Sequence, residues 1–221
     1  MPRTQFEQEL EEVQEIASRM GALVEEAIRQ AVQSLLDRDR VAATAVIEND
    51  EKINQLHTQL REEVFRVMAT QAPVARDLRL LIGLQYIGAE LERMGDYARR
   101  IAKRVRKLVA QPQPQNSDAT YVDLGRMGQL AEQQVHDILS AFIATDPERA
   151  AAVARRDDNI DRLYRKVFAE QVSALQSDPD HVMPIQHLLN IAHTLERIGD
   201  RVNNVAEDII FLDTGQVVEL D

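Results

Sequence analysis

One six-residue pattern occurs twice in this chain, and it constrains the fold more than any other feature. The pattern Leu-Glu-Arg-hydrophobic-Gly-Asp spans residues 91–96 and recurs 104 residues later at residues 195–200. A second pattern, at residues 50–56, recurs at residues 157–163 with a shift of 107. The chain therefore contains two copies of one unit of about a hundred residues, which is long enough to form a three-helix bundle.

The composition favours helix over sheet. Of the 221 residues, 44% are apolar and only 4% aromatic, and Ala, Leu, Glu, Gln and Arg are abundant. These residues have high helix propensity. We therefore predict an all-α protein of two tandem, pseudo-symmetric three-helix bundles with six long helices.

Several classes of protein are excluded at this stage. The chain has no cysteine, so disulfides, thiolate ligands and thiol catalysis are absent, and a metal would be bound by oxygen or imidazole. No apolar signal core follows the first residues, and no run of 18 apolar residues occurs. We expect a soluble, cytoplasmic protein without a transmembrane segment.

The charge distribution argues against nucleic-acid binding. The net charge is −11, with about −1 in residues 1–115 and about −10 in residues 116–221. One basic run interrupts this pattern near the end of the third predicted helix: Arg99, Arg100, Lys103, Arg104, Arg106 and Lys107. Such a run is typical of a solvated helix C-terminus. The alternative is contact with an anionic partner or a lipid surface.

Caps and prolines divide each copy into three helices. Asp39 is placed to cap the second helix, Pro73 separates the second from the third, and Asp146 with Pro147 begins the fifth. The predicted helices cover residues 4–36, 40–70, 74–110, 119–144, 147–176 and 181–212. The polar, proline-containing residues 111–118 form the linker, so the two repeats comprise residues 1–110 and 119–221.

Apolar residues at alternating steps of four and three mark the core side of the third and sixth helices. In the third helix they are Ile87, Leu91, Met94, Ala98, Ile101, Val105 and Leu108. In the sixth they are Ile191, Leu195, Ile198, Val202, Val205, Ile209 and Leu212. We interpret this spacing as packing alone.

Acidic residues form a stripe beside the core side of the sixth predicted helix. On a helical wheel, Glu196, Asp200 and Glu207 fall within about 40° of one another, and Asp157 and Asp161 lie next to the core side of the fifth helix. If the two helices are neighbours, these carboxylates converge in one groove. Such a cluster requires protons, basic partners or bound cations. Oxygen ligands suit Mg²⁺, Ca²⁺, Mn²⁺ or iron.

The first repeat has a changed version of this stripe. Asp50, Asn54, Glu92 and Asp96 occupy the positions of Asp157, Asp161, Glu196 and Asp200. However, Arg99 and Lys103 stand where the second repeat has Asn203 and Glu207. Because two cations on the stripe can replace a metal, we expect the first site to be weaker or poorer in metal. The alternative, a merely solvated acidic face, is common in Glu-rich helices, but recurrence of the whole motif favours a functional site.

The glycine of each motif supports that interpretation. A glycine inside a helix costs about 1 kcal/mol relative to alanine, and Gly95 and Gly199 lie between the apolar side and the acidic stripe. Each leaves space for another helix or for a ligand. His57 and His193 lie near the stripes but are not repeated, so we interpret them as solvated or capping side chains and not as ligands. The lack of Glu-x-x-His motifs argues against a ferritin-like di-iron oxidase.

The duplicated motifs, their spacing and the two-repeat organisation resemble those of the PhoU family, regulators of phosphate transport and phosphate-starvation signalling. The resemblance implies divalent or trivalent metal ions (Mg, Mn, Fe or Zn) held by carboxylates. Carried over, the sites are Asp50, Asn54, Glu92 and Asp96, and Asp157, Asp161, Glu196 and Asp200. It also implies a non-enzymatic homodimer, near the inner face of the membrane, that couples the ATPase subunit of a phosphate ABC transporter to a sensor histidine kinase and holds the phosphate regulon off.

Two other functions stay open from the residues alone. A carboxylate-bridged metal enzyme could act on a phosphate ester or on oxygen, since two metals can clamp an in-line displacement, but the sequence offers no evident base. A structural helical adaptor with solvated acidic stripes is the other alternative.

Overall fold

A computed structural model describes residues 3–112, 118–177, 179–215 and 217–220. The first repeat contains α1 (Arg3–Leu36), α2 (Arg40–Gln71) and α3 (Ala75–Leu108). The second contains α4 (Asp118–Ala144), α5 (Pro147–Ala154), α6 (Asp158–Ser177), the short 3₁₀ helix η1 (Pro179–His181) and α7 (Val182–Thr214). The predicted all-α fold of two three-helix repeats is confirmed.

The helix ends follow the predicted local chemistry. The Asp39 carboxylate accepts hydrogen bonds from the backbone N–H groups of Val41 and Ala42, and the Asp146 carboxylate accepts one from Arg149. These bonds satisfy donors that have no partner within the helix. Pro147 fits the first turn of α5 because its missing N–H is not needed there. The predicted boundaries at these positions are therefore confirmed.

One predicted helix is wrong in its continuity. Residues 147–176 do not form a single helix, because the chain turns at residues 155–157 between α5 and α6. The Asp157 N–H still bonds Ala154 (2.9 Å), whereas the Asp157 carbonyl accepts from Ile160 (2.8 Å) and so begins a new helix. Five consecutive polar residues lie here, and Asp and Asn favour helix starts over helix interiors. Asp157 therefore lies at the start of α6, whereas Asp50 lies inside α2.

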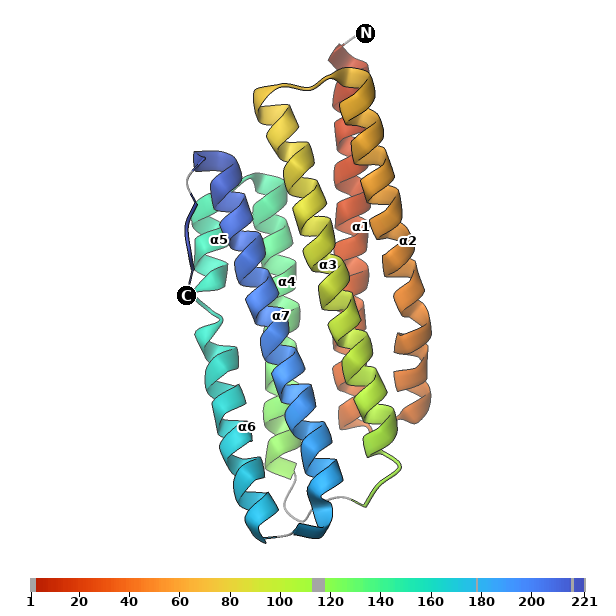
Figure 1. The fold of residues 1–221 in the computed structure, drawn as a ribbon, viewed down its shortest axis with the longest axis vertical. Helices are drawn as coiled ribbons and strands as arrows, with labels where there is room; N and C mark the ends of the chain where they lie inside the picture. The colour runs from red at the N-terminus through yellow and green to blue at the C-terminus, as the bar shows by residue number, and fades with distance from the viewer. Residues whose placement is uncertain (1–2, 113–117, 178, 216, 221) are drawn as a thin grey trace.

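The two repeats pack against each other through α3 with α7 and α1 with α4. In Figure 1, α3 and α7 run side by side, with α2 and α6 on either side and α1 and α4 behind them; contacts join α3 to α7 and α1 to α4. A single hydrophobic core extends through both repeats. The repeats are therefore two halves of one body and not two bundles with separate cores.

Two close contacts between α1 and α4 show the pseudo-two-fold relation. A Cβ atom at Gly21 would overlap the side chain of Leu139, and a Cβ atom at Gly128 would overlap that of Val32. Gly128 and Leu139 lie 107 residues after Gly21 and Val32, respectively. The same contact therefore occurs twice with its roles exchanged, as a two-fold interface requires.

The predicted core positions of α3 and α7 are buried, with one exception. All seven in α3 are at most 1% exposed, as are the first six in α7. Leu212, the seventh, is only partly buried, and it packs near Gly83 of α3. Among the described helices, none is long and apolar enough to cross a membrane.

Candidate metal centres

The packing of α6 against α7 brings together the four predicted acids of the second repeat. Asp157 lies at the turn before α6 and Asp161 in its first turn, while Glu196 and Asp200 lie on α7. Burial raises the pKa of Asp157 to about 6, and the negative charges of Asp161, Asp200 and Glu196 contribute to the rise. Burial and the Asp200 charge also raise the pKa of Glu196. The four carboxylates are thus near enough to repel one another.

Asp157 is the most confined member of this cluster. Its Oδ2 accepts a hydrogen bond from Asn203 Nδ2 at 2.9 Å. Its Oδ1 and the Asn203 Oδ1 are buried without a hydrogen-bond donor. Two buried oxygen atoms without donors are the kind of group that binds a cation, because an unpaired buried acceptor is costly.

Gly199 makes room for the Asp157 carboxylate. A Cβ atom at Gly199 would overlap Asp157 Oδ1. At the matching position in the first repeat, a Cβ atom at Gly95 would instead lie 2.9 Å from Ile53 Cδ1, an apolar contact. The glycine of the motif therefore leaves space for a carboxylate in the second repeat and for an apolar side chain of the neighbouring helix in the first.

The other acids of the second cluster have exposed partners. Arg197 Nη1 lies 2.9 Å from Asp200 Oδ2, and Arg165 lies 3.3 Å from Asp161. Asp161 and Asp200 retain 39% and 31% of their side-chain exposure, so solvent weakens these ion pairs. These two ion pairs therefore contribute little to stability.

His193 contacts the cluster, and the interpretation of this histidine as a solvated or capping side chain missed that contact. Its Nδ1 lies 3.1 Å from Glu196 Oε2, although the histidine side chain is 56% exposed. Its ring also lies near that of Tyr164, with centroids 5.9 Å apart. The signal in the sequence was the three-residue spacing between His193 and Glu196, which places both on one side of a helix.

Glu207 has a different neighbour from the four clustered acids. Its Oε1 accepts a hydrogen bond from the Leu220 backbone N–H at 2.9 Å. It lies seven residues beyond Asp200, about 10 Å further along α7. Glu207 therefore holds the C-terminal segment against α7.

The first-repeat cluster contains its own cation. Arg99 Nε lies 3.0 Å from Asp50 Oδ2, and Arg99 Nη2 lies 2.5 Å from Asp96 Oδ1. Asn54 Nδ2 also approaches Asp50 Oδ2, at 3.5 Å. Burial raises the pKa of Asp50, whereas the charges of Arg99 and Lys103 oppose that rise. Burial and the Asp96 charge raise the pKa of Glu92.

The two clusters thus differ at one equivalent contact. Arg99 and Asn203 occupy the same place in their motifs, and each reaches the matching aspartate, Asp50 or Asp157. The arginine brings a positive charge, whereas the asparagine brings none. Within the described residues, no three His, Asp or Glu side chains are grouped as they stand to hold a metal ion. The second cluster offers carboxylate and amide oxygens, which are the ligands that hard cations prefer, whereas Arg99 occupies the corresponding place in the first cluster.

The metal-free protein should lose stability as the pH rises from about 4 to about 6. The Asp157 pKa is about 6 in the folded protein against 3.8 for an ordinary Asp side chain, so the folded state binds this proton more tightly. Its stabilising contribution is complete below 3.8 and is lost as the pH rises through 6. Asp157→Asn should flatten this part of the profile, by on the order of 1 kcal/mol after solvent screening.

Urea unfolding at a series of pH values measures this effect. Asp208 offers a matched control, because burial also raises its pKa to about 6, helped by the charges of Glu90 and Glu207. Asp208→Asn should remove its own part of the slope and leave that of Asp157. An identical slope in the Asp157→Asn variant and the parent would contradict the raised pKa.

Comparison with known proteins assigns the chain to a family. Residues 17–105 and residues 124–209 each match the family model of the PhoU domain. The chain belongs to the PhoU family. It is 36% identical over 211 residues to a phosphate-specific transport system accessory protein PhoU homolog of Pseudomonas aeruginosa, covering 96% of this chain and 86% of that protein. A homolog with the same description from Clostridium acetobutylicum is 33% identical over 222 residues, covering 100% of both.

Solved PhoU structures have the same fold. The crystal structure of PhoU from Pseudomonas aeruginosa matches with a TM-score of 0.89 and 34% identity, over 96% of this chain and 100% of that one. The phosphate transport system regulatory protein PhoU from Streptococcus pneumoniae matches with a TM-score of 0.88 and 30% identity, over 97% and 100%. These PhoU proteins are named as accessory or regulatory proteins, which confirms the prediction that the chain is not an enzyme.

Proposed function

We propose that this PhoU-family chain is a negative regulator that relays phosphate sufficiency between the ATPase subunit of a phosphate ABC transporter and a sensor histidine kinase. The observation that carries the proposal is the match of both repeats, over nearly the whole chain, to proteins named for phosphate-specific transport. Family membership supports the broader role, an accessory function in phosphate transport. The relay between the transporter ATPase and the sensor kinase is the more specific part of the proposal.

A regulator without chemistry of its own acts through binding. The enzyme alternative, a carboxylate-bridged phosphoesterase or oxidase, loses its basis because the relatives are accessory proteins. The structural-adaptor alternative is compatible with the fold but leaves the buried Asp157 and Asn203 oxygens without a partner. A homodimer stays a prediction.

The second cluster is the site we propose for a metal ion. Its ligands would be the carboxylates of Asp157, Asp161, Glu196 and Asp200. Carboxylate oxygens favour Mg²⁺, Mn²⁺ or iron, and a neighbouring imidazole also suits Zn²⁺. A bound cation would relieve the repulsion among these carboxylates and tie α6 to α7. In the first cluster Arg99 supplies positive charge without a metal. The two repeats would therefore differ in metal content.

Deleting the gene should raise transcription of phosphate-regulated genes in cells that grow with abundant phosphate. The reason is that a negative regulator holds this transcription off when phosphate is plentiful. Reporter expression and quantitative transcript measurement would test it, with the parent strain and a complemented strain as controls. If transcription stays repressed in the deletion strain, the regulatory assignment is wrong.

A further inference from the structure

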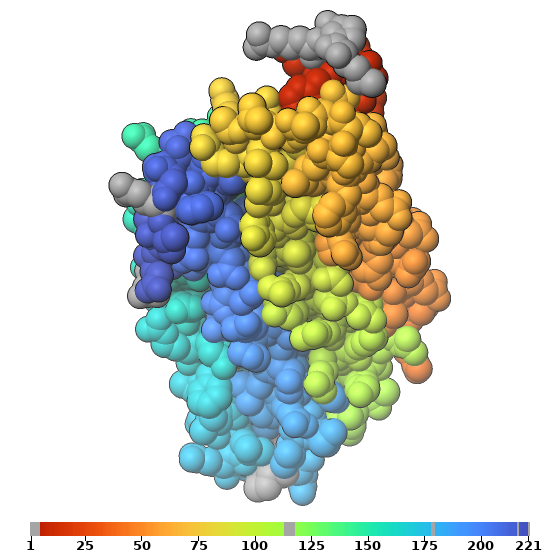
Figure 2. All heavy atoms as spheres, turned by 45° about the horizontal axis from the view of Figure 1, so that its top comes forward, coloured from red at the N-terminus to blue at the C-terminus, as the bar shows by residue number. Residues whose placement is uncertain are grey.

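His193 lies at the edge of the second cluster and contacts one of its carboxylates. It stands on α7 three residues before Glu196, and its Nδ1 lies 3.1 Å from Glu196 Oε2. In the first repeat the matching position is Ala89, so the motif carries an imidazole in the second repeat alone. Figure 2 shows the surfaces of α6 and α7 adjoining on an open face of the molecule. The His193 side chain is 56% exposed, so an ion can reach it from solvent.

The contact between His193 and Glu196 is not a hydrogen bond. Glu196 Oε2 is buried and has no hydrogen-bond donor, although the His193 nitrogen is only 3.1 Å away. A second contact shows the difference: His136 Nδ1 lies 3.2 Å from Glu25 Oε2 and is aligned with it as a hydrogen bond. The two histidines are similarly exposed, at 56% and 59%. The His193 ring thus lies beside its carboxylate without directing a hydrogen at it.

Glu196 Oε2 is the third buried oxygen of this cluster that has no donor. The other two are Asp157 Oδ1 and Asn203 Oδ1. Buried acceptors of this kind are costly until a proton or a cation binds them. A neutral imidazole adds a nitrogen lone pair to such a set. The second cluster therefore offers a cation three buried oxygens and one nitrogen.

The separation of His193 Nδ1 and Glu196 Oε2 is that of two ligands of one ion. Zn²⁺ binds imidazole nitrogen and carboxylate oxygen at about 2.0–2.2 Å, so two such ligands lie about 3.0–3.4 Å apart. The 3.1 Å distance falls within this range. An ion bound by both atoms would satisfy the lone pairs of each, which their contact alone does not do.

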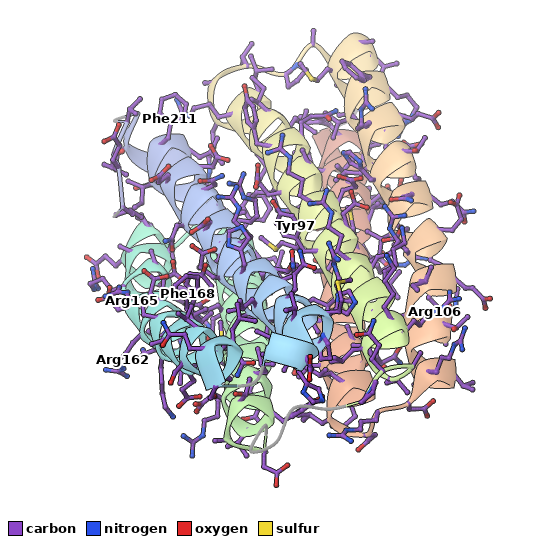
Figure 3. The ribbon with its side chains drawn as sticks, turned by 60° about the horizontal axis from the view of Figure 1, so that its bottom comes forward. Tyr97, Arg106, Arg162, Arg165, Phe168 and Phe211 are labelled. Carbon is purple, nitrogen blue, oxygen red and sulfur yellow. The ribbon has the colours of Figure 1, made fainter. Side chains whose placement is uncertain are left out.

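Tyr164 of α6 restricts the orientation of the His193 ring. The two ring centroids are 5.9 Å apart, and the ring planes are tilted by 39°. Tyr164 in turn lies beside Phe168, with centroids 6.3 Å apart, and Figure 3 labels Phe168 on α6 next to α7. A histidine that binds a metal needs its ring held in one orientation. Packing between the rings of the two helices supplies that support.

We propose that His193 binds the metal ion of the second cluster through Nδ1, together with Glu196, and that this imidazole makes the site prefer Zn²⁺ to Mg²⁺. Imidazole nitrogen suits Zn²⁺, whereas Mg²⁺ is bound through oxygen. The first cluster has Ala89 at this position and Arg99 beside its aspartates, so the preference belongs to the second repeat. The inference rests on the proposed metal site and deepens it by adding a ligand and a selectivity.

The Zn²⁺ and Mg²⁺ affinities of the full chain test the role of His193. Protein cleared of metal is titrated at about pH 7.5, where most imidazoles are neutral, with Zn²⁺ against a chromophoric chelator and with Mg²⁺ by calorimetry. His193→Phe keeps a ring beside Tyr164 but removes the nitrogen. We expect it to weaken the tighter Zn²⁺ site by about tenfold or more and to change Mg²⁺ affinity by less than about threefold.

His136→Phe is the matched control, because His136 is equally exposed and contacts a carboxylate at nearly the same distance. It should leave both affinities within about twofold of the parent. Nuclear magnetic resonance of protein with ¹⁵N-labelled histidine gives a second readout. Zn²⁺ should shift the Nδ1 resonance of one imidazole, and that resonance should be missing from His193→Phe and present in His136→Phe. Circular dichroism melting verifies that each variant folds.

Two results would overturn the proposal. One is Zn²⁺ binding by His193→Phe as tight as that of the parent, because ring packing alone would then explain the position of His193. The other is Zn²⁺ binding by the parent without a shift of the His193 nitrogen. If either result came with loss of Zn²⁺ binding in a Glu196→Ala and Asp200→Ala variant, the metal site would stand and only the His193 ligand would be rejected. The deletion strain tests the regulatory function separately.

Discussion

Titration of metal-free protein with Mn²⁺ should show two classes of site, with the tighter class in the second repeat. The reason is that Asp157, Asp161, Glu196 and Asp200 surround unpaired buried oxygens. In the first repeat, Arg99 already neutralises Asp50 and Asp96. We expect the affinities to differ by at least about tenfold, corresponding to about 1.4 kcal/mol. Isothermal titration calorimetry, with elemental analysis of the purified protein, measures both classes.

Paired variants locate the two classes. Glu196→Ala with Asp200→Ala should abolish the tighter class, and Glu92→Ala with Asp96→Ala should remove only the weaker. Each pair is the motif counterpart of the other, so each serves as the control for the other. Unchanged tight binding after the Glu196/Asp200 substitution, in protein cleared of adventitious ions, would refute a metal site there.

Exchanging one residue between the repeats should exchange their metal affinities. Asn203→Arg places a guanidinium beside Asp157, where Arg99 stands beside Asp50 in the first repeat. This variant should bind Mn²⁺ at the second-repeat site about a hundredfold or more weakly than the parent. The reason is that a fixed cation repels a second one in a partly buried cluster. Arg99→Asn should do the opposite and strengthen the first site by about tenfold.

Calorimetry on both single variants and on the double exchange measures this effect. Arg197→Gln is the control, because Arg197 pairs with Asp200 from an exposed position and is 40% exposed. Its removal should change affinity by less than about threefold. If Asn203→Arg bound Mn²⁺ as tightly as the parent, the difference between the clusters would have a source other than this contact.

The break between α5 and α6 sets the position of Asp157, and this position contributes to the expected difference in metal affinity between the two clusters. Because the turn at residues 155–157 begins α6 at Asp158, Asp157 approaches Gly199 closely enough that a Cβ atom there would overlap its carboxylate. Asp50 in the continuous α2 has no such contact, and Gly95 faces Ile53 instead. The two clusters therefore differ in backbone geometry as well as in charge.

Periodicity and local chemistry were enough to predict the all-α fold and the four acids that α6 and α7 bring together, although they missed the break between α5 and α6 and the contact of His193 with Glu196. The two copies of the hexapeptide indicated a duplication, and the four-and-three spacing identified the buried side of α3 and α7. Caps at Asp39 and Asp146 placed helix starts because the cap is made by neighbouring residues. These features depend on residues within one or two turns of each other, so the sequence contains them directly.

Contacts between helices were decided by tertiary structure. A helical wheel shows that Arg99 shares a stripe with Asp96, but only the packing of α2 on α3 shows that it also reaches Asp50. The same holds for Asn203 and Asp157 and for the Gly21 and Gly128 contacts that join the repeats. It holds too for the basic run of α3, in which Arg99 and Lys103 lie near Asp50 whereas Arg104 and Lys107 lie near His187 of α7. Sequence spacing determines the face of a helix on which a side chain lies, whereas its partner depends on which helix packs against that face and how closely.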